Sequence, residues 1–211
     1  MLSAIAAAAA GLAFLCRRGL VGPRVVRLAL GWGLAANELI WWVYRYSHEG
    51  VHRTNLPLQL CDVTVWLSVV ACLTLRAWAV EFTYFAGIAG AGMALLTPDL
   101  WSPWPSYPAI YFFLTHGGMV VACVVLSFGR AAPPLRTAAP ACAFAVLVAY
   151  ALALGAFNAI LGTNYMYLCA KPRSLSLLNW LGPWPVYLGG AAAIGVALFW
   201  LLWLPVRWAN R

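Results

Sequence analysis

The sequence predicts an all-α fold, a polytopic membrane helix bundle of about seven transmembrane helices. Hydrophobic residues make up 64% of the 211-residue chain and charged residues only 9%, whereas ordinary soluble domains carry roughly 25% charged residues. Long apolar runs recur along the chain, each close to the ~20 residues that cross the hydrocarbon core of a bilayer. The connecting segments are too short for a further domain, so we expect residues 1–211 to form a single integral membrane domain.

Seven apolar runs define the expected helices, and these are 2–16, 25–46, 57–75, 78–96, 108–128, 138–162 and 184–205. The first run is the shortest and is rich in alanine, so six spans plus an interfacial segment remain an alternative. No positive residue precedes this run, as one would in a secretory signal peptide. Two arginines, Arg17 and Arg18, follow it instead.

The basic residues between the runs predict the orientation, because cytoplasmic loops carry an excess of Lys and Arg. The larger group is Arg17, Arg18, Arg24, Arg27, Arg76, Arg130, Arg136, Arg207 and Arg211, and the smaller is Arg45, Arg53, Lys171 and Arg173. This asymmetry places the N-terminus outside. We expect a multi-pass protein of the cell membrane, in a bacterial inner membrane. The net charge of +8 is mainly this topology signal, and without a nucleic-acid motif we expect no nucleic-acid partner.

The third run opens with an unusual stretch, TNLPLQLCD, at residues 54–62. Pro57 suits the first position of a helix, where its missing N–H costs nothing, and Asn55 or Thr54 would cap that end. Cys61 is then expected in the second turn, near the outer surface. A helix N-terminus favours a thiolate, but the effect fades after the first turn and Asp62 opposes it, so Cys61 needs a base.

His116 is the candidate base. It lies about eight residues into the fifth run, roughly 12 Å deep at 1.5 Å per residue, and an ionisable side chain at that depth indicates function. Gly117 and Gly118 beside it allow either close helix packing or room for a ligand. A thiol with a histidine base is an activated nucleophile. The alternative is that His116 only bonds a neighbouring helix while Cys61 packs as an apolar residue.

Further polar residues converge on the same membrane face. Glu38 lies about two turns from the outer end of the second run, so it should be protonated or paired. It would orient His116, pair with Arg45 or Arg53, or bridge helices. Asparagines flank the outer end of the sixth run, and they are candidates for oxyanion stabilisation. The supporting residues we expect are Glu38, Gln59, Asp62, Gly117, Asn158, Asn164, Tyr165 and Trp184, the last in a stiff GPWP turn.

Two other interpretations use some of the same residues. HEGVH at residues 48–52 matches H-E-x-x-H, which on a helix binds zinc in metalloproteases, with Asp62, Asp99 or His116 as a possible third ligand. Gly50 and Pro57 argue that the helix ends here, so we expect no metal. Alternatively, Cys61 and Cys169 both fall outside, where a disulfide would survive, and a bonded Cys61 is no nucleophile.

Five motifs occur in a characteristic order along the chain. They are LPLQLCD at 56–62, LLTPDL at 95–100, FFLTHGG at 112–118, GTNYMYLCAKP at 162–172 and LGPWPVY at 181–187. Together they resemble the YwaF-type integral membrane family, whose animal relative is transmembrane protein 164. The resemblance runs from about residue 30 to 205. HEGVH lies outside the family pattern, which weakens the zinc interpretation.

The resemblance implies an activity and two site residues. The animal relative is described as an acyltransferase that moves fatty acyl groups onto lysophospholipids with one cysteine and one histidine, which correspond to Cys61 and His116. Our leading hypothesis is therefore an acyltransferase acting on phospholipid or lysophospholipid at the outer leaflet, without a cofactor. With water as acceptor the same site is a lipase. The main alternative is a lipid- or solute-binding transporter in which Glu38, His116 and Asn158 line a midplane site.

Overall fold

The computed structural model describes residues 1–98, 100, 102–172 and 176–209, so Asp99, Arg173 and Arg211 lie outside the described part. Its described residues form helices and loops without a strand. The long helices are α1 (Leu2–Arg17), α2 (Pro23–Glu49), α3 (Leu60–Thr74), α6 (Tyr107–Phe128), α7 (Ala139–Leu161) and α8 (Val186–Ala209), with α4 (Ala77–Phe82), η1 (Thr83–Gly87) and α5 (Ile88–Leu96) running on as one further helix. Two short 3₁₀ turns, η2 (Tyr165–Tyr167) and η3 (Leu177–Leu181), lie between α7 and α8.

The predicted helical membrane bundle is confirmed, and each apolar run overlaps one of these helices. Among the described residues, four segments are long and apolar enough to cross a membrane: 77–96, 107–128, 139–161 and 186–208. Two shorter apolar helices, α1 and α3, complete the set with α2, which has 27 residues and carries polar side chains in its C-terminal half. With 16 residues, α1 is about 24 Å long.

Local sequence signals explain where the helices begin and end. Proline occupies the first turn of α2, α6 and α7, where no N–H is needed and the fixed φ suits the helix. Glycine ends two helices at a positive φ, Gly50 after α2 at φ 72° and Gly162 after α7 at φ 63°. A residue without a Cβ adopts this conformation at no steric cost.

The third helix begins later than the sequence predicts, at Leu60 and not at Pro57. Its N-cap is Gln59, whose N–H donates to Asp62 Oδ2 at 3.0 Å. The carbonyl of Leu58 points away to accept the Tyr150 hydroxyl at 2.8 Å. Because these bonds hold the preceding residues outside the helix, Cys61 is the second residue of α3 and lies in its first turn. The prediction of a second-turn cysteine is wrong.

Glycines of α6 let this helix approach α1 and α2 closely. A Cβ on Gly117 would lie 2.9 Å from Ile5 Cδ1 of α1, and one on Gly118 would lie 2.9 Å from Leu34 Cδ2 of α2. Close approach through small residues is the usual basis of helix association in membranes. Of the two expectations for the glycine pair beside His116, helix packing is the one that the structure shows.

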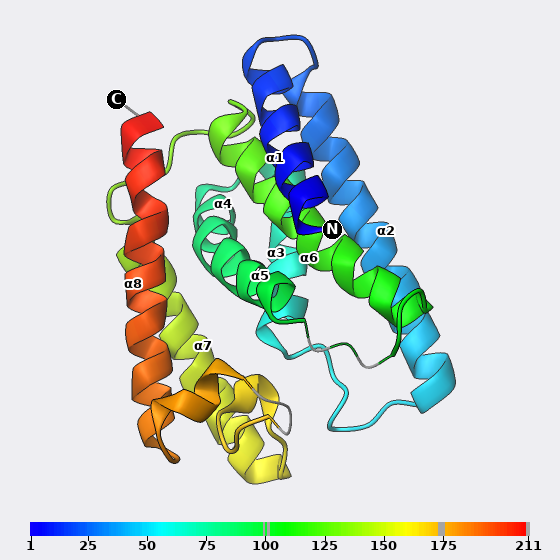
Figure 1. Cartoon of the computed structure of the whole chain (residues 1–211), viewed down its shortest axis with the longest axis vertical. Helices are drawn as coiled ribbons and strands as arrows, with labels where there is room; N and C mark the ends of the chain where they lie inside the picture. Colours follow the sequence, from blue (N-terminus) through cyan, green and yellow to red (C-terminus); the bar gives the residue numbers. More distant parts are fainter. Residues whose placement is uncertain (99, 101, 173–175, 210–211) are drawn as a thin grey trace.

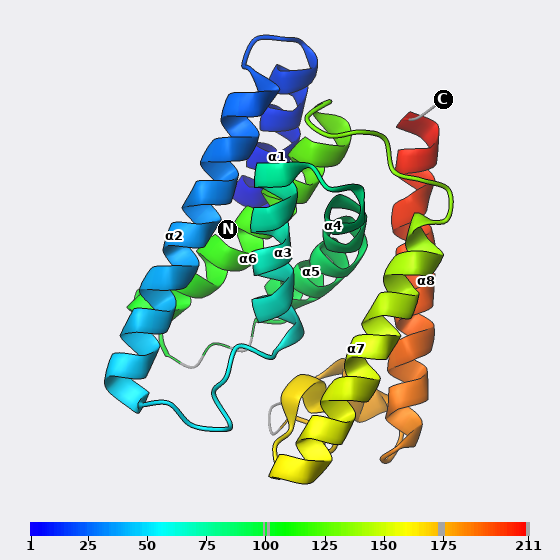
Figure 2. The same cartoon turned by 180° about the vertical axis from the view of Figure 1, so that it is seen from behind.

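The helices form two groups (Figures 1 and 2). In both views α1, α2, α3, α6 and the α4–α5 helix pack together, while α7 and α8 run side by side along one flank. The Tyr84 hydroxyl ties the groups by donating to the Leu202 carbonyl at 3.0 Å. The most buried large side chains of the first group include Tyr84, Phe85 and Met119, whereas the α7 and α8 spans are mostly exposed, as expected of helices that face lipid.

The loops divide between the two ends of the bundle as predicted from the sequence. Segments 50–59, 97–106 and 162–185 gather at one end, which we call the site end and which is lowest in Figure 1. The opposite end carries the short connections 18–22, 75–76 and 129–138. There Arg136 donates to the buried Glu81 carboxylate at 2.8 and 2.6 Å. The connections at this end hold four of the nine arginines assigned above to the cytoplasm, namely Arg18, Arg76, Arg130 and Arg136.

Candidate active site

A cavity of about 410 Å³ opens at the site end, within the size range of small-molecule sites. Cys61 and His116 both line it, as do Gln59, Asp62 and Tyr165. The cavity wall does not include the other expected supporting residues, which are Glu38, Gly117, Asn158, Asn164 and Trp184. The remaining lining residues are Trp41, Arg45, Thr54, Leu56, Leu60, Thr64, Gly90, Ala91, Ala94, Leu100, Pro108, Tyr111, Phe112, Thr115, Met166 and Tyr167.

Cys61 is half-buried at the N-terminus of α3. In the first turn its side chain lies at the positive end of the helix dipole, which favours the thiolate, while the Asp62 carboxylate in the same turn opposes it. This position strengthens the argument for a nucleophile, because a second-turn cysteine would gain little from the dipole. Its thiol is free, and so is that of the exposed Cys169.

The hydrogen bond of His116 determines which ring nitrogen is basic. Nδ1 lies 2.8 Å from the carbonyl oxygen of Phe112. A carbonyl can only accept, so Nδ1 carries the proton, and in the neutral imidazole Nε2 holds the free lone pair. The Phe112 ring packs against the imidazole with centroids 4.3 Å apart. This buried histidine is therefore fixed in the tautomer that a general base needs.

The N-cap of α3 is joined to the loop after α7. Gln59 donates its N–H to Asp62 Oδ2, and its side-chain Oε1 accepts the N–H of Met166 at 2.9 Å. Both carboxamide and carboxylate thus hold the backbone around Cys61. Their places in the cavity wall follow from this local structure.

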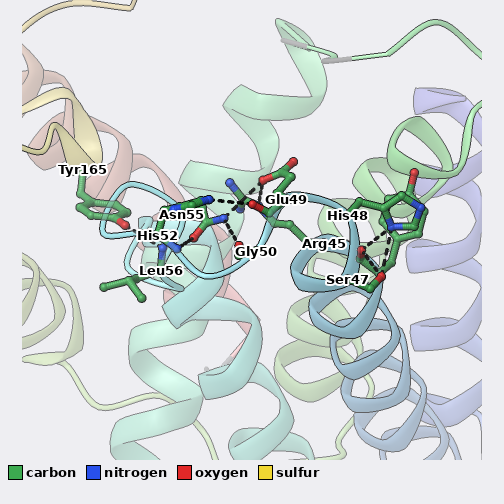
Figure 3. Close-up of polar contacts among 10 residues, drawn as sticks. Arg45, Ser47, His48, Glu49, Gly50, His52, Asn55, Leu56 and Tyr165 are labelled. Atoms are coloured by element: carbon green, nitrogen blue, oxygen red, sulfur yellow. Dashed lines mark hydrogen bonds and ion pairs between the residues drawn. The ribbon is translucent and has the colours of Figure 1, made fainter.

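Tyr165 holds the loop between α2 and α3. Its hydroxyl accepts the N–H of Leu56 at 2.8 Å (Figure 3) and donates to the carbonyl of Arg53 at 2.9 Å. Burial raises the pKa of the Tyr165 phenol, so the hydroxyl keeps its proton at neutral pH. It can therefore act as donor and acceptor at once.

Asn158 positions Tyr165 without reaching the cavity. Its Oδ1 accepts the Tyr165 N–H at 2.9 Å and the Thr163 hydroxyl at 2.7 Å, and its Nδ2 donates to the Tyr165 carbonyl at 3.0 Å. Asn164 binds the backbone of Cys169 and Ala170 in the same loop. With both ends of each amide occupied, these asparagines organise the loop.

Glu38 is fully buried and bridges α2 and α6. It accepts the Tyr111 hydroxyl at 2.6 and 3.1 Å, and Trp41 stacks on the Tyr111 ring at 4.1 Å. Of the three roles considered for Glu38, the bridge between helices is the one observed. The next residue, Asn37, donates to the Thr115 hydroxyl at 2.8 Å, so this pair of bonds supports the cavity wall from behind.

Trp184 lies in the turn before α8 and is 60% exposed. Its Nε1 donates to the Leu168 carbonyl at 3.0 Å. The structure therefore places it at the base of the 162–185 loop and outside the cavity wall.

Sequence reasoning missed the α6 residues that line the cavity with His116. Tyr111, Phe112 and Thr115 precede it by one turn or one residue, and Pro108 lies one turn further back. The 3.6-residue period of the helix was the available signal, since residues three or four apart share a face.

The HEGVH stretch forms a helix end. Helix α2 stops at Glu49, so His48 and His52 do not share a helical face. His48 Nδ1 contacts the Tyr44 carbonyl and His52 Nε2 the Glu49 carbonyl, each at 2.7 Å. Glu49 pairs with Arg45 at 3.1 Å (Figure 3). Within the described ranges, no three His, Cys, Asp or Glu side chains are grouped to hold a metal ion.

A protein-family model described as the TMEM164 family matches residues 1–203. No curated protein and no solved structure matches the chain.

Proposed function

The chain belongs to the TMEM164 family, and from this premise we propose that it is a membrane-embedded acyltransferase that uses Cys61 as nucleophile and His116 as base. The observation that carries the proposal is that both residues line one cavity, with the thiol in the first turn of α3 and the imidazole bonded to a carbonyl through Nδ1. A histidine base is one means of activating a thiol nucleophile, and the shared cavity wall supports this pairing.

The first half of the reaction forms a thioester. His116 Nε2 takes the proton of the Cys61 thiol, and the sulfur attacks the carbonyl carbon of a lipid ester. The carbonyl oxygen becomes an oxyanion in a tetrahedral intermediate. When the intermediate collapses, the ester C–O bond breaks, and the imidazolium gives its proton to the leaving alkoxide. The products are a lysolipid and an acyl group bound to Cys61.

The second half transfers the acyl group. An acceptor hydroxyl gives its proton to His116 Nε2 while its oxygen attacks the thioester carbon. The C–S bond then breaks, and the imidazolium returns the proton to the Cys61 sulfur. If water is the acceptor, the product is a free fatty acid and the enzyme is a lipase.

The composition of the cavity wall supports a phospholipid or lysophospholipid as substrate. One part of the wall is apolar, with Leu60, Ala91 and Ala94, while Arg45, whose Nε pairs with Glu49, adds a guanidinium, the group best matched to a phosphate. A phospholipid combines these two chemistries in one molecule. We place the site in the outer leaflet of a bacterial inner membrane on the basis of the arginine distribution.

The transporter alternative has less support. It requires Glu38, His116 and Asn158 to line one polar site, but only His116 lines the cavity. The other two side chains are buried. Glu38 is hydrogen-bonded to Tyr111, and Asn158 is hydrogen-bonded to the backbone of Tyr165. A bound solute would find them already partnered.

The proposal is tested by the intact mass of the purified protein after incubation with phosphatidylcholine nanodiscs. We expect a fatty-acyl increment on the wild type that neutral hydroxylamine removes and that Cys61→Ala lacks. Cys169→Ala, which removes the exposed thiol of the same end, is the matched control and should keep the increment. An increment that persists in Cys61→Ala, or none in the wild type, would sink the thioester mechanism.

A further inference from the structure

The carbonyl oxygen of the lipid ester becomes negatively charged when a thiolate attacks it, and the cavity must stabilise that charge. Removing a single such donor typically slows an enzyme about 10²–10³-fold. We propose that the side-chain amide of Gln59 is the donor, with Nε2–H bonded to the oxyanion of the tetrahedral intermediate formed on Cys61. This assignment rests on the proposed function and adds a third catalytic residue to it.

The orientation of the Gln59 amide follows from its partner. Met166 offers a backbone N–H at 2.9 Å, and an N–H can be accepted only by the amide oxygen. Oε1 is therefore fixed on the side of Met166, and Nε2 points away from it at the opposite corner of the planar amide. The usual ambiguity between the two amide atoms does not arise here.

The backbone of Gln59 is fixed as well. Its N–H donates to Asp62 Oδ2 at 3.0 Å, and it holds the extended conformation of an N-cap, φ −66° and ψ 153°. The side chain is thus anchored at both ends, two residues before the nucleophile, and it lines the same cavity as Cys61 and His116. A donor that is held in place before the reaction starts costs little reorganisation in the transition state.

The Nε2 group retains its capacity to donate. Among the residues that the structure describes, none accepts a hydrogen bond from it. The other candidates at this end are already committed: Asn158 to Tyr165, Asn164 to Ala170 and the Tyr111 hydroxyl to Glu38. The two asparagines also do not line the cavity, so the oxyanion role expected for them from the sequence passes to Gln59.

The chemical role is limited to the charged intermediates. As the sulfur bonds to the carbonyl carbon, the C=O π electrons move to oxygen, and Nε2–H of Gln59 donates to that oxygen. When the C=O bond re-forms and the ester C–O bond breaks, the hydrogen bond weakens. The same contact recurs when the acceptor hydroxyl attacks the thioester. Gln59 neither gains nor loses a proton at any step.

Two variants and two rates test the assignment. The first rate is acylation of Cys61 by phosphatidylcholine nanodiscs, followed by intact mass. The second is alkylation of Cys61 by iodoacetamide in a background without the other five cysteines, a displacement that forms no oxyanion. Gln59→Met removes the amide at similar volume, whereas Gln59→Glu keeps an acceptor for Met166 N–H but loses the donor.

If Gln59 stabilises the oxyanion, both variants lower the ratio of acylation to alkylation rate about 10²–10³-fold. The ratio is normalised to thiol reactivity, so an effect of the added charge on the Cys61 thiolate cancels. The carboxylate of Gln59→Glu would also repel the oxyanion, so the uncharged Gln59→Met is the decisive variant. If Gln59 only tethers Met166, Gln59→Met keeps the wild-type ratio and the assignment is overturned. A wild type that is alkylated but never acylated on Cys61 instead overturns the proposed function, and the Gln59 role with it.

Discussion

His116 Nδ1 and the Phe112 carbonyl oxygen lie 2.8 Å apart, one helical turn from each other in α6. The helix thus supplies the group that orients its own histidine, whereas many catalytic histidines are oriented by a carboxylate. A carbonyl cannot take up a proton, so it fixes the tautomer without adding a negative charge to a site inside the membrane. The buried carboxylate nearby, Glu38, serves Tyr111 instead.

Replacing His116 by alanine should slow acylation of Cys61 by about 10²–10⁴-fold, the usual contribution of a general base. Hydroxylamine-sensitive adduct formation measures the effect. His48→Ala is the matched control, because this imidazole also bonds the carbonyl four residues earlier but lies outside the cavity wall. Equal rates in His116→Ala and wild type would remove His116 from the mechanism.

Chelation should leave acylation unchanged. The zinc interpretation requires HEGVH to bind a metal, but the two imidazoles contact carbonyl oxygens at the end of α2. We therefore expect equal adduct formation before and after treatment with EDTA, followed by gel filtration into metal-free buffer. Activity lost on chelation and regained on addition of zinc would revive the metal site.

Tyr165→Phe should loosen the loop between α2 and α3. The substitution removes the shared partner of the Leu56 N–H and the Arg53 carbonyl, and a hydrogen bond of this kind contributes about 0.5–1.5 kcal/mol. We expect a lower unfolding temperature and faster hydrogen exchange within residues 50–59. Tyr46→Phe is the control, since Tyr46 contributes ring stacking on Trp42 at 5.1 Å. Unchanged exchange in Tyr165→Phe would show that the loop does not depend on this phenol.

Glu38→Ala should destabilise the bundle because it leaves the Tyr111 hydroxyl buried without its acceptor. The expected loss in unfolding free energy is about 1–3 kcal/mol. Glu38→Gln keeps an acceptor oxygen and should recover most of it. Thermal unfolding in detergent measures the stability, and alkylation of Cys61 by iodoacetamide should be equal in the folded variants. A Glu38→Gln protein as unstable as Glu38→Ala would argue that the charge itself matters.

Gly117→Val should push α1 away from α6, because even a Cβ would come within 2.9 Å of Ile5 Cδ1. Overpacking of this kind costs about 1–3 kcal/mol. Adding Ile5→Ala should restore most of the stability, which a double-mutant cycle would report. Gly92→Val controls for helix propensity, since no atom lies within 4 Å of a Cβ at that position. Additive losses in the cycle would mean that α1 and α6 do not meet here.

The helix positions could be predicted because lipid imposes a length and a composition on each span. The start of α3 could not, since it depends on partners distant in sequence. Pro57 is a sound local signal for a helix start, but Tyr150 and Tyr165 hold flanking backbone groups, and Met166 holds the Gln59 side chain. No pattern within residues 54–62 reveals these bonds.

The nucleophile and base were predicted to lie together, and both line one cavity. Some of the supporting residues line the cavity and others do not, and residue type alone does not predict which. Gln59 and Asp62 line the cavity because they cap the helix of Cys61, whereas Glu38 and Asn158 are equally polar but find partners away from it. Only packing distinguishes a polar side chain that faces a substrate from one that faces a neighbouring helix.

The phenol of Tyr165 reaches back 109 residues to Leu56 and 112 residues to Arg53. A chain that leaves the ribosome from its N-terminus therefore exposes Cys61 and His116 well before the wall around them is complete. Until α7 and the loop behind it are in place, the cavity that the proposed reaction needs is incomplete. The proposed activity would therefore begin only once the last part of the chain has folded.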